Sequence, residues 1–193
     1  AKLISDENAS DPDRLVTAAR PNTSATMAET TFAGGAARNV TVTTTGTGDN
    51  AKTCTITGTD VFGDAQTEVI VSTGSAATVA GTKLFLTVSA VECSAQYAAN
   101  ITVGSGDLCA DTILGSERVR LKGFSIVSGG TAGVVNFING TPESGSILFK
   151  SRTIGTDNTT VDRTIPQNGI LFENGMVVQY TIATIDMMTF FHG

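Results

Sequence analysis

The chain has 193 residues, and its 12 basic and 18 acidic side chains give a formal charge of −6. Because phosphate binding requires clustered Lys and Arg, this balance argues against nucleic acid as a partner. The sequence has no apolar run long enough for a membrane helix and no charged-then-apolar leader, so we expect a soluble, unsecreted protein without a membrane partner.

The composition favours β-structure. Charged residues make up 16% of the chain, against about 25% in an average soluble domain, and Thr, Val, Gly and Ala fill the difference. Thr and Val are β-branched and suit a pleated sheet, whereas the usual helix-forming residues are scarce. The hydrophobic fraction of 40% is enough to build cores.

Residues 1–30 show no sustained hydrophobic period and contain Pro12 and Pro21. This polar stretch is typical of an extended arm that becomes ordered on a partner. A single helical turn opened by Asp11 and Pro12 is the alternative, because Asp caps a helix and Pro suits its first position.

Residues 31–106 change to a period of two. Val40 and Val42 alternate with Thr, and Leu84 and Leu86 repeat the pattern later. The strand-like segments recur about every ten residues and are bounded by Gly, Asn and Asp, which is typical of a small β-sandwich.

Residues 107–193 show the same pattern with more continuous apolar runs. Asn139-Gly140 is a strong turn signal, and Pro166 ends a strand because proline donates no backbone hydrogen bond. The sequence therefore predicts an all-β protein in which two small antiparallel β-sandwich units, Ig-like or jelly-roll-like, occupy 31–106 and 107–193 and follow an N-terminal arm at 1–30.

Two groups in the second unit have alternative interpretations. Arg118, Arg120 and Lys122 are spaced by two, which places them on one face of a strand and favours an ordinary solvated face. Phe190 and Phe191 end an apolar C-terminal segment that either packs on its own core or docks into a neighbouring subunit.

The sequence offers little for catalysis. The one histidine, His192, is the penultimate residue, where fraying is expected. No serine stands in a G-x-S-x-G motif and no cysteine has a neighbouring histidine. The carboxylates Glu68, Glu92 and Glu173 lie apart in sequence, which leaves a glycosidase-type pair open.

A turn flanked by Asp60 and Asp64 is a candidate calcium site, although ordinary capping of the turn by Asp is the favoured interpretation. We therefore expect no catalytic, cofactor-binding or metal-binding residue, no cofactor and no enzymatic activity.

Three cysteines exclude complete pairing within one chain. Cys54 lies in a strand-like run, where a buried small hydrophobic residue is the simplest interpretation. A Cys54–Cys93 bridge and pairing of Cys109 between chains remain alternatives, because spacing alone says nothing about geometry.

Two passages resemble virion proteins of tailed bacteriophages. The first comprises residues 56–68 (ITGTDVFGDAQTE), 79–83 (VAGTK) and 100–104 (NITVG), and the second comprises 121–123 (LKG), 140–148 and 165–175 (IPQNGILFENG). The shared residues lie mostly in turns and at strand ends, so they are more specific for architecture than for a role in the virion.

The resemblance implies a multi-copy virion component that assembles in the host bacterial cytoplasm. The favoured role is a capsid decoration or cement protein that stabilises the shell through contacts with other virion proteins, either the major capsid protein or neck and tail proteins. Homo-oligomerisation is also expected. The alternatives are a tail, neck or fibre component with a receptor- or glycan-facing C-terminal module, and a carbohydrate-active enzyme.

Overall fold

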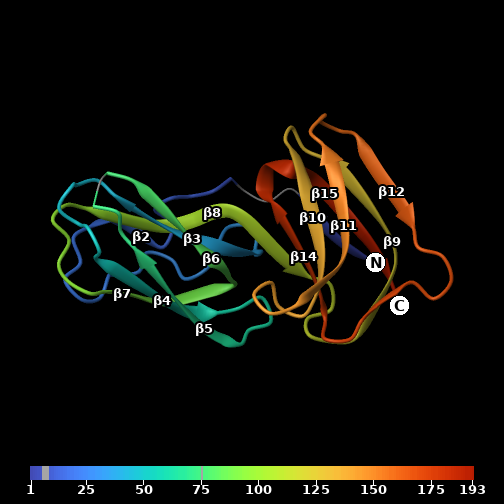
Figure 1. The fold of residues 1–193 in the computed structure, drawn as a ribbon, viewed down its shortest axis with the longest axis horizontal. Coiled ribbons are helices and arrows are strands. Elements are labelled where there is room, and N and C mark those ends of the chain that lie inside the picture. Colours follow the sequence, from blue (N-terminus) through green and yellow to red (C-terminus); the bar gives the residue numbers. More distant parts are fainter. Residues whose placement is uncertain (6–8, 75) are drawn as a thin grey trace. The chain divides into compact units, whose positions relative to one another are not determined.

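The computed structural model describes residues 1–5, 9–74 and 76–193. The strands in chain order are β1 (Lys2–Ser5), β2 (Val16–Ala19), β3 (Ala37–Thr44), β4 (Thr53–Thr59), β5 (Ala65–Val71), β6 (Thr78–Phe85), β7 (Thr87–Cys93), β8 (Ile101–Thr112), β9 (Val119–Ser128), β10 (Ala132–Asn139), β11 (Ser146–Ile154), β12 (Thr160–Thr164), β13 (Ile170–Phe172), β14 (Met176–Thr181) and β15 (Ile185–His192). Within the described ranges, helix is limited to the 3₁₀ turn η1 (Ile182–Thr184). The predicted all-β class is confirmed (Figure 1).

The chain divides into two compact units. Unit 1 comprises residues 1–8 and 108–193, and unit 2 comprises residues 9–107. The boundary lies within β8, one residue from the predicted position, and each unit contains strands from two sheets. This arrangement is consistent with the two predicted β-sandwiches.

Unit 2 has a three-stranded sheet in the order β5-β4-β7, and a second sheet in which β2, the first part of β8, β3 and β6 are neighbours. Period-two alternation builds the core, because Cys54 and Ile56 of β4 are buried while the intervening Thr residues are only half-buried. Phe85, Tyr97 and Val103 belong to the same hydrophobic cluster.

The predicted arm at 1–30 is wrong as a separate element. β1 pairs in antiparallel fashion with β15, with Ile4 opposite Met188, so the first residues belong to unit 1. Leu15 and Val16 are fully buried in the core of unit 2, and β2 pairs with β8. Residues 6–8 of the predicted arm lie outside the described residues.

Close backbone packing holds the start of unit 2 in place. The backbone N–H of Ser105 donates to the Asp11 carbonyl at 2.8 Å, and that of Leu15 donates to the Val103 carbonyl at 2.9 Å. A Cβ atom at Gly104 would collide with the backbone of Asp11, so this approach to β8 requires glycine. The alternative of a helical turn through residues 15 and 16 is also wrong. Pro12 and Asp13 form a single tight turn, closed by a 3.5 Å hydrogen bond from the Arg14 N–H to the Asp11 carbonyl, and the chain then bends into β2.

Unit 1 has one sheet in the order β1-β15-β9-β12, with β13 also on β9, and a second in which β11, β10, β14 and the end of β8 are neighbours. Its core contains a group of phenylalanine rings. Phe137 lies 5.1 Å from Phe124, 5.4 Å from Phe149 and 5.9 Å from Phe190, measured between ring centroids. These tilted and edge-to-face arrangements are the favourable geometries for aromatic pairs.

Candidate interaction surface

Strand β11 lies at the end of its sheet, and β10 is its strand neighbour in that sheet. In the described part of the chain, no strand pairs with the other side of β11. An edge of this kind leaves backbone donors and acceptors available for pairing with another chain. This nine-residue strand is therefore a candidate docking element.

Alternation along β11 separates a core face from a solvent face. Phe149 lies opposite Phe137 and is half-buried, and Ser151 is buried. Lys150 lies between these inward positions and Arg152 follows Ser151, and both basic side chains are exposed. β11 thus exposes basic side chains on one face, while Phe149 on the other face packs against Phe137 of β10.

Apolar side chains accompany these basic groups. Ile154 is 67% exposed, and Ile147 and Leu148 are exposed as well. We call Ile147, Leu148, Lys150, Arg152 and Ile154 the β11 edge surface. Scattered exposed hydrophobic residues are normal, but several on one edge strand make this surface a candidate for interaction.

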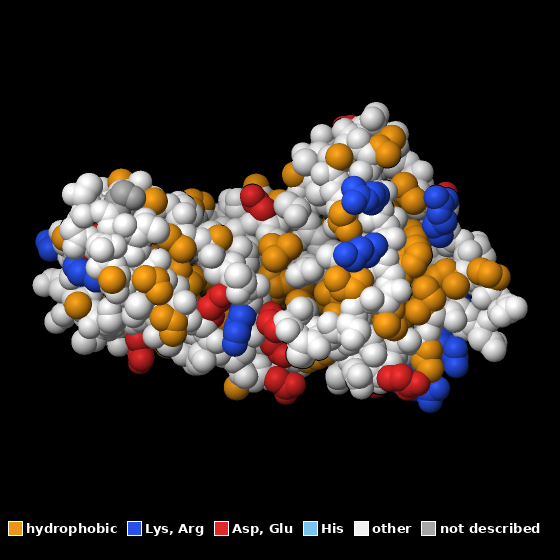
Figure 2. All heavy atoms as spheres, in the orientation of Figure 1, with side chains coloured by type: hydrophobic (Ala, Val, Ile, Leu, Met, Phe, Trp, Pro, Cys, Tyr) orange, Lys and Arg blue, Asp and Glu red, His pale blue; other side chains and the backbone are white. Residues whose placement is uncertain are grey.

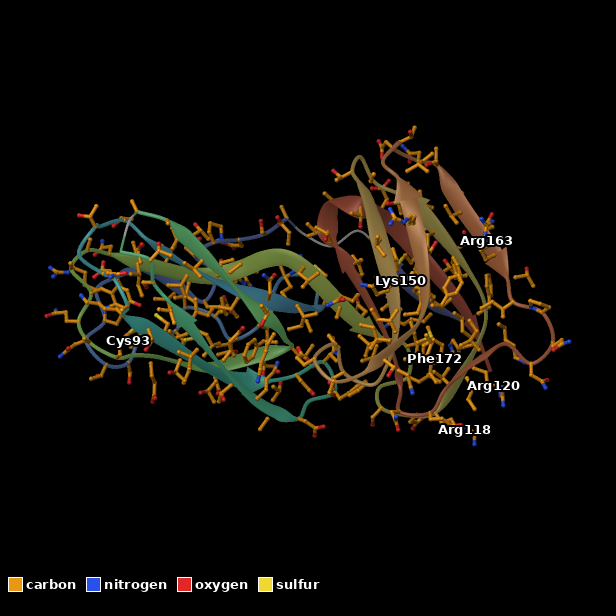
Figure 3. All side chains as sticks on the ribbon, in the orientation of Figure 1. Cys93, Arg118, Arg120, Lys150, Arg163 and Phe172 are labelled. Atoms are coloured by element: carbon orange, nitrogen blue, oxygen red, sulfur yellow. The ribbon has the colours of Figure 1, made fainter. Side chains whose placement is uncertain are left out.

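Strand β12 is an edge of the other sheet of unit 1. Figure 2 shows Lys and Arg side chains over β11 and β12, with hydrophobic side chains between them, and Figure 3 labels Lys150 and Arg163 among these basic residues. β11 itself carries two basic residues and no acidic one, although the whole chain has a formal charge of −6. The charge of this surface therefore favours an acidic partner.

Strand β5 of unit 2 also lies at the end of a sheet and exposes Val69 and Val71, but its edge is bridged to β6. Oε1 of Glu68 accepts hydrogen bonds from the Thr82 backbone N–H at 2.7 Å and from the Thr82 hydroxyl at 3.0 Å. Nε2 of Gln66 donates to the Leu84 carbonyl at 2.6 Å. These side chains cover the edge of β5, which makes it a control for β11.

A second surface feature of unit 1 is a hollow of about 410 Å³ lined by Phe124, Ser125, Asp162, Arg163, Thr164 and Phe191. The side chain of Phe191 is 52% exposed, while the adjacent Phe190 is buried. Gly123 lies opposite Phe191 in the β15–β9 register and opposite Thr164 in the β12–β9 register. A Cβ atom at Gly123 would lie 2.8 Å from the carbonyl oxygen of Arg163, so the close approach of β12 to β9 beside the hollow favours glycine.

Both interpretations of the C-terminal phenylalanines therefore have a structural counterpart. Phe190 packs in the core and contacts Phe137, whereas Phe191 remains available to an external partner. Neighbouring residues on a strand point to opposite faces of the sheet, which explains this division.

The structure separates the candidate carboxylates. Glu68 lies opposite Ile56 and Glu92 lies opposite Thr55 of β4, so alternation places these carboxylates on opposite faces of the sheet in unit 2. Glu173, in unit 1, forms an exposed ion pair with Arg118, with 3.2 Å between Oε2 and Nε. No pair of glycosidase type forms between Glu68 and Glu92.

Asp60 acts as a turn cap. Its Oδ1 accepts hydrogen bonds from the backbone N–H groups of Phe62 at 2.8 Å and Asp64 at 2.9 Å. This is the favoured interpretation of the Asp60–Asp64 turn. Within residues 1–5, 9–74 and 76–193, His, Cys, Asp and Glu side chains form no group of three able to hold a metal ion.

His192 is paired and not frayed. It ends β15 opposite Leu121, and the next residue, Gly193, exchanges two backbone hydrogen bonds of 3.1 Å with Arg120. Burial, together with the positive charge of the chain's N-terminus, lowers the pKa of His192. The structure therefore places His192 within the β15–β9 pairing, where sequence position alone predicts a frayed end.

The predicted solvated face at the start of β9 is confirmed. Arg118 and Lys122 are exposed and Arg120 is half-buried. The ion pair of Arg118 with Glu173 and the 3.3 Å hydrogen bond from Nη1 of Arg120 to the Asn168 carbonyl both lie at the surface. Lys150 and Arg152 of β11 are not among the residues that the sequence patterns above single out. The signal was available, because they show the same spacing of two next to apolar residues.

No protein-family model, curated protein or solved structure matches this chain. The described ranges contain no helix that is long and apolar enough to cross a membrane.

Proposed function

We propose that the chain is a non-enzymatic structural protein of a tailed-bacteriophage virion, most specifically a decoration or cement protein of the capsid. The observation that carries this proposal is the β11 edge surface, which combines an unpaired strand edge with exposed apolar and basic side chains. The resemblance of residues 56–68 and 165–175 to virion proteins supplies the setting.

The proposed partner is an extended, acidic segment of a neighbouring virion protein. Such a segment adds to β11 as a further strand, so that main-chain hydrogen bonds provide affinity and side chains provide specificity. Lys150 and Arg152 disfavour pairing of β11 with the same strand of a second copy, because like charges then come close together. Homo-oligomers of this protein therefore use another surface.

Basic residues on an edge strand also have a protective role, since natural proteins place Lys there to prevent aggregation. Protection alone gives no reason for Ile147, Leu148 and Ile154 to be exposed beside them. Reversing the charge of Lys150 or Arg152 separates the two interpretations. If these residues only protect the edge, the variants should aggregate. If they bind a partner, fewer copies of the chain should be found on particles.

Lys150→Glu and Arg152→Glu are each expected to reduce the number of copies of this chain on purified virions by about tenfold, because each substitution sets an acidic group against an acidic partner. Mass spectrometry of gradient-purified particles measures the copy number. Lys122→Glu is the matched control, since it reverses the charge of an exposed strand residue in the same unit.

The control variant should remain at the wild-type copy number. Equal occupancy of all three variants would contradict docking through β11. Absence of the wild-type chain from particles, with the protein found only in the free fraction, would contradict the virion role itself.

The hollow beside Phe191 favours a second candidate function, a tail, neck or fibre component whose unit 1 faces a glycan. An exposed aromatic ring next to hydroxyl, carboxylate and guanidinium groups provides a stacking platform with polar contacts, and its volume is within the range of small-ligand sites. If this function is correct, the wild-type protein should bind to an array of bacterial surface glycans. The Phe191→Ala substitution should weaken that binding by about tenfold, because it removes the exposed ring. Met187→Ala, which alters an exposed residue of the same strand, should leave that binding unchanged. Wild-type protein that binds no glycan would remove this candidate.

A further inference from the structure

Two cysteines of unit 2 face each other across neighbouring strands. Cys54 of β4 is directly opposite Cys93 of β7 in the antiparallel register. Their Sγ atoms are 3.7 Å apart, and both residues are present as thiols. The pair therefore results from strand register and not from a chance approach of flexible side chains.

The backbone geometry suits a disulfide. Directly opposite residues of antiparallel strands have Cα atoms about 4.5–5.5 Å apart. Disulfides span Cα separations of about 4.4–6.8 Å, and their sulfur atoms lie about 2.05 Å apart. Small rotations of the two side chains thus suffice to form the bond, and the strands keep their positions.

Polar groups around the pair favour its chemistry. The Cys54 sulfur lies 3.2 Å from the Tyr97 hydroxyl, which is itself 3.0 Å from the Ser72 hydroxyl. Hydrogen bonding from Cys93, together with that from Tyr97, lowers the pKa of the Cys54 thiol. The pKa of Cys93 is raised, because its proton is shared with Cys54 and the thiol is buried. Thiolate character at Cys54 is what an attack on an oxidised partner requires.

We propose that Cys54 and Cys93 form a modification site at which a peroxide oxidant produces a cross-strand disulfide within one chain. One thiol is first oxidised to a sulfenic acid, and the peroxide is reduced to water. The second sulfur then attacks the sulfenic sulfur, the S–S bond forms, and the oxygen leaves as a second molecule of water. Two thiols and one hydrogen peroxide thus give one disulfide and two waters.

The location of the pair determines the effect of the bond. Cys54 and Cys93 are 39 positions apart in sequence, and the bond joins β4 to β7 at one end of the sheet. Closing a loop of this size restricts the unfolded chain and stabilises the folded unit. The use of this bond, although not its formation, depends on the proposed virion role, in which a protein made in a reducing cytoplasm is released into an oxidising medium.

Purified wild-type protein treated with hydrogen peroxide should lose two of its three thiols in a thiol titration, together with two hydrogen atoms in intact mass. Peptide mapping should find the fragment containing Cys54 linked to the fragment containing Cys93, which is the one cysteine labelled in Figure 3. The unfolding midpoint of unit 2 should rise by about 10 °C.

Cys109→Ala should show the same loss of two thiols, because Cys109 lies in β8 opposite Tyr180 and away from the pair in the strand register. Cys93→Ala should form no intrachain disulfide. Three unchanged thiols, sulfinic acid without a cross-link, or a disulfide involving Cys109 in the wild-type protein would each overturn the proposal. These measurements use the purified chain, so their failure is distinct from failure of the chain to join particles.

Discussion

Phe137→Ala is expected to lower the free energy of unfolding of unit 1 by about 3–5 kcal/mol, which is the usual cost of removing a buried aromatic ring. Phe137 is fully buried and contacts the rings of Phe124, Phe149 and Phe190. Its removal leaves a cavity and deprives these partners of their aromatic contacts. Because Phe149 lies on β11, the same change should loosen the candidate docking strand.

Denaturant unfolding followed by hydrogen exchange measures this effect separately in the two units. Ile154→Ala is the control, since its side chain is 67% exposed, and it should change the stability by no more than about 0.5 kcal/mol. A loss below about 1 kcal/mol for Phe137→Ala would contradict a tightly packed aromatic core.

Leu15→Ala is expected to lower the free energy of unfolding of unit 2 by about 2–5 kcal/mol, because it removes a fully buried side chain from the core cluster. The residue lies within the stretch that the sequence predicts to be an arm. An arm residue that is ordered only on a partner would tolerate the change without loss of stability.

Leu3→Ala is the matched control for this prediction. It changes the same residue type within the same predicted arm, but Leu3 is 57% exposed. Chemical denaturation of both variants should show a large loss for Leu15→Ala and a change of no more than about 0.5 kcal/mol for Leu3→Ala. Equal stabilities would support the arm and contradict the packing of residues 15 and 16.

The sequence predicts the fold class because alternation is a local signal. β4 alternates buried and half-buried positions as expected, and β12 ends at Thr164, shortly before Pro166. Gly140, Gly169 and Gly175 have the positive φ values that their turn motifs favour.

The position of the N-terminal residues was not predictable in this way. β1 has four residues, too few to show a period, and its partner β15 is at the other end of the chain. The pairing of β1 with β15 depends on the whole fold, so no local sequence pattern predicts it. Leu15 and Val16 form an equally short apolar signal between polar residues.

The candidate site was predictable only in part. The spacing of Lys150 and Arg152 is visible in the sequence, but the position of β11 at the end of a sheet is a property of strand order. The spacing of Cys54 and Cys93 does not predict their pairing for the same reason, since their register depends on β4 and β7 being neighbours. Phe191 belongs to an apolar C-terminal segment that is visible in the sequence, but the hollow that it lines also needs Asp162, Arg163 and Thr164 of β12, whose position depends on strand order.

Hydrogen exchange of the chain in its particle-bound and free forms tests the docking of β11 most directly. The backbone amides of residues 146–154 that point away from β10 should gain strong protection on particles, while those of β5, whose edge is already bridged to β6, should exchange as they do in the free protein. Unchanged exchange along β11 in the bound chain would contradict strand addition at this edge.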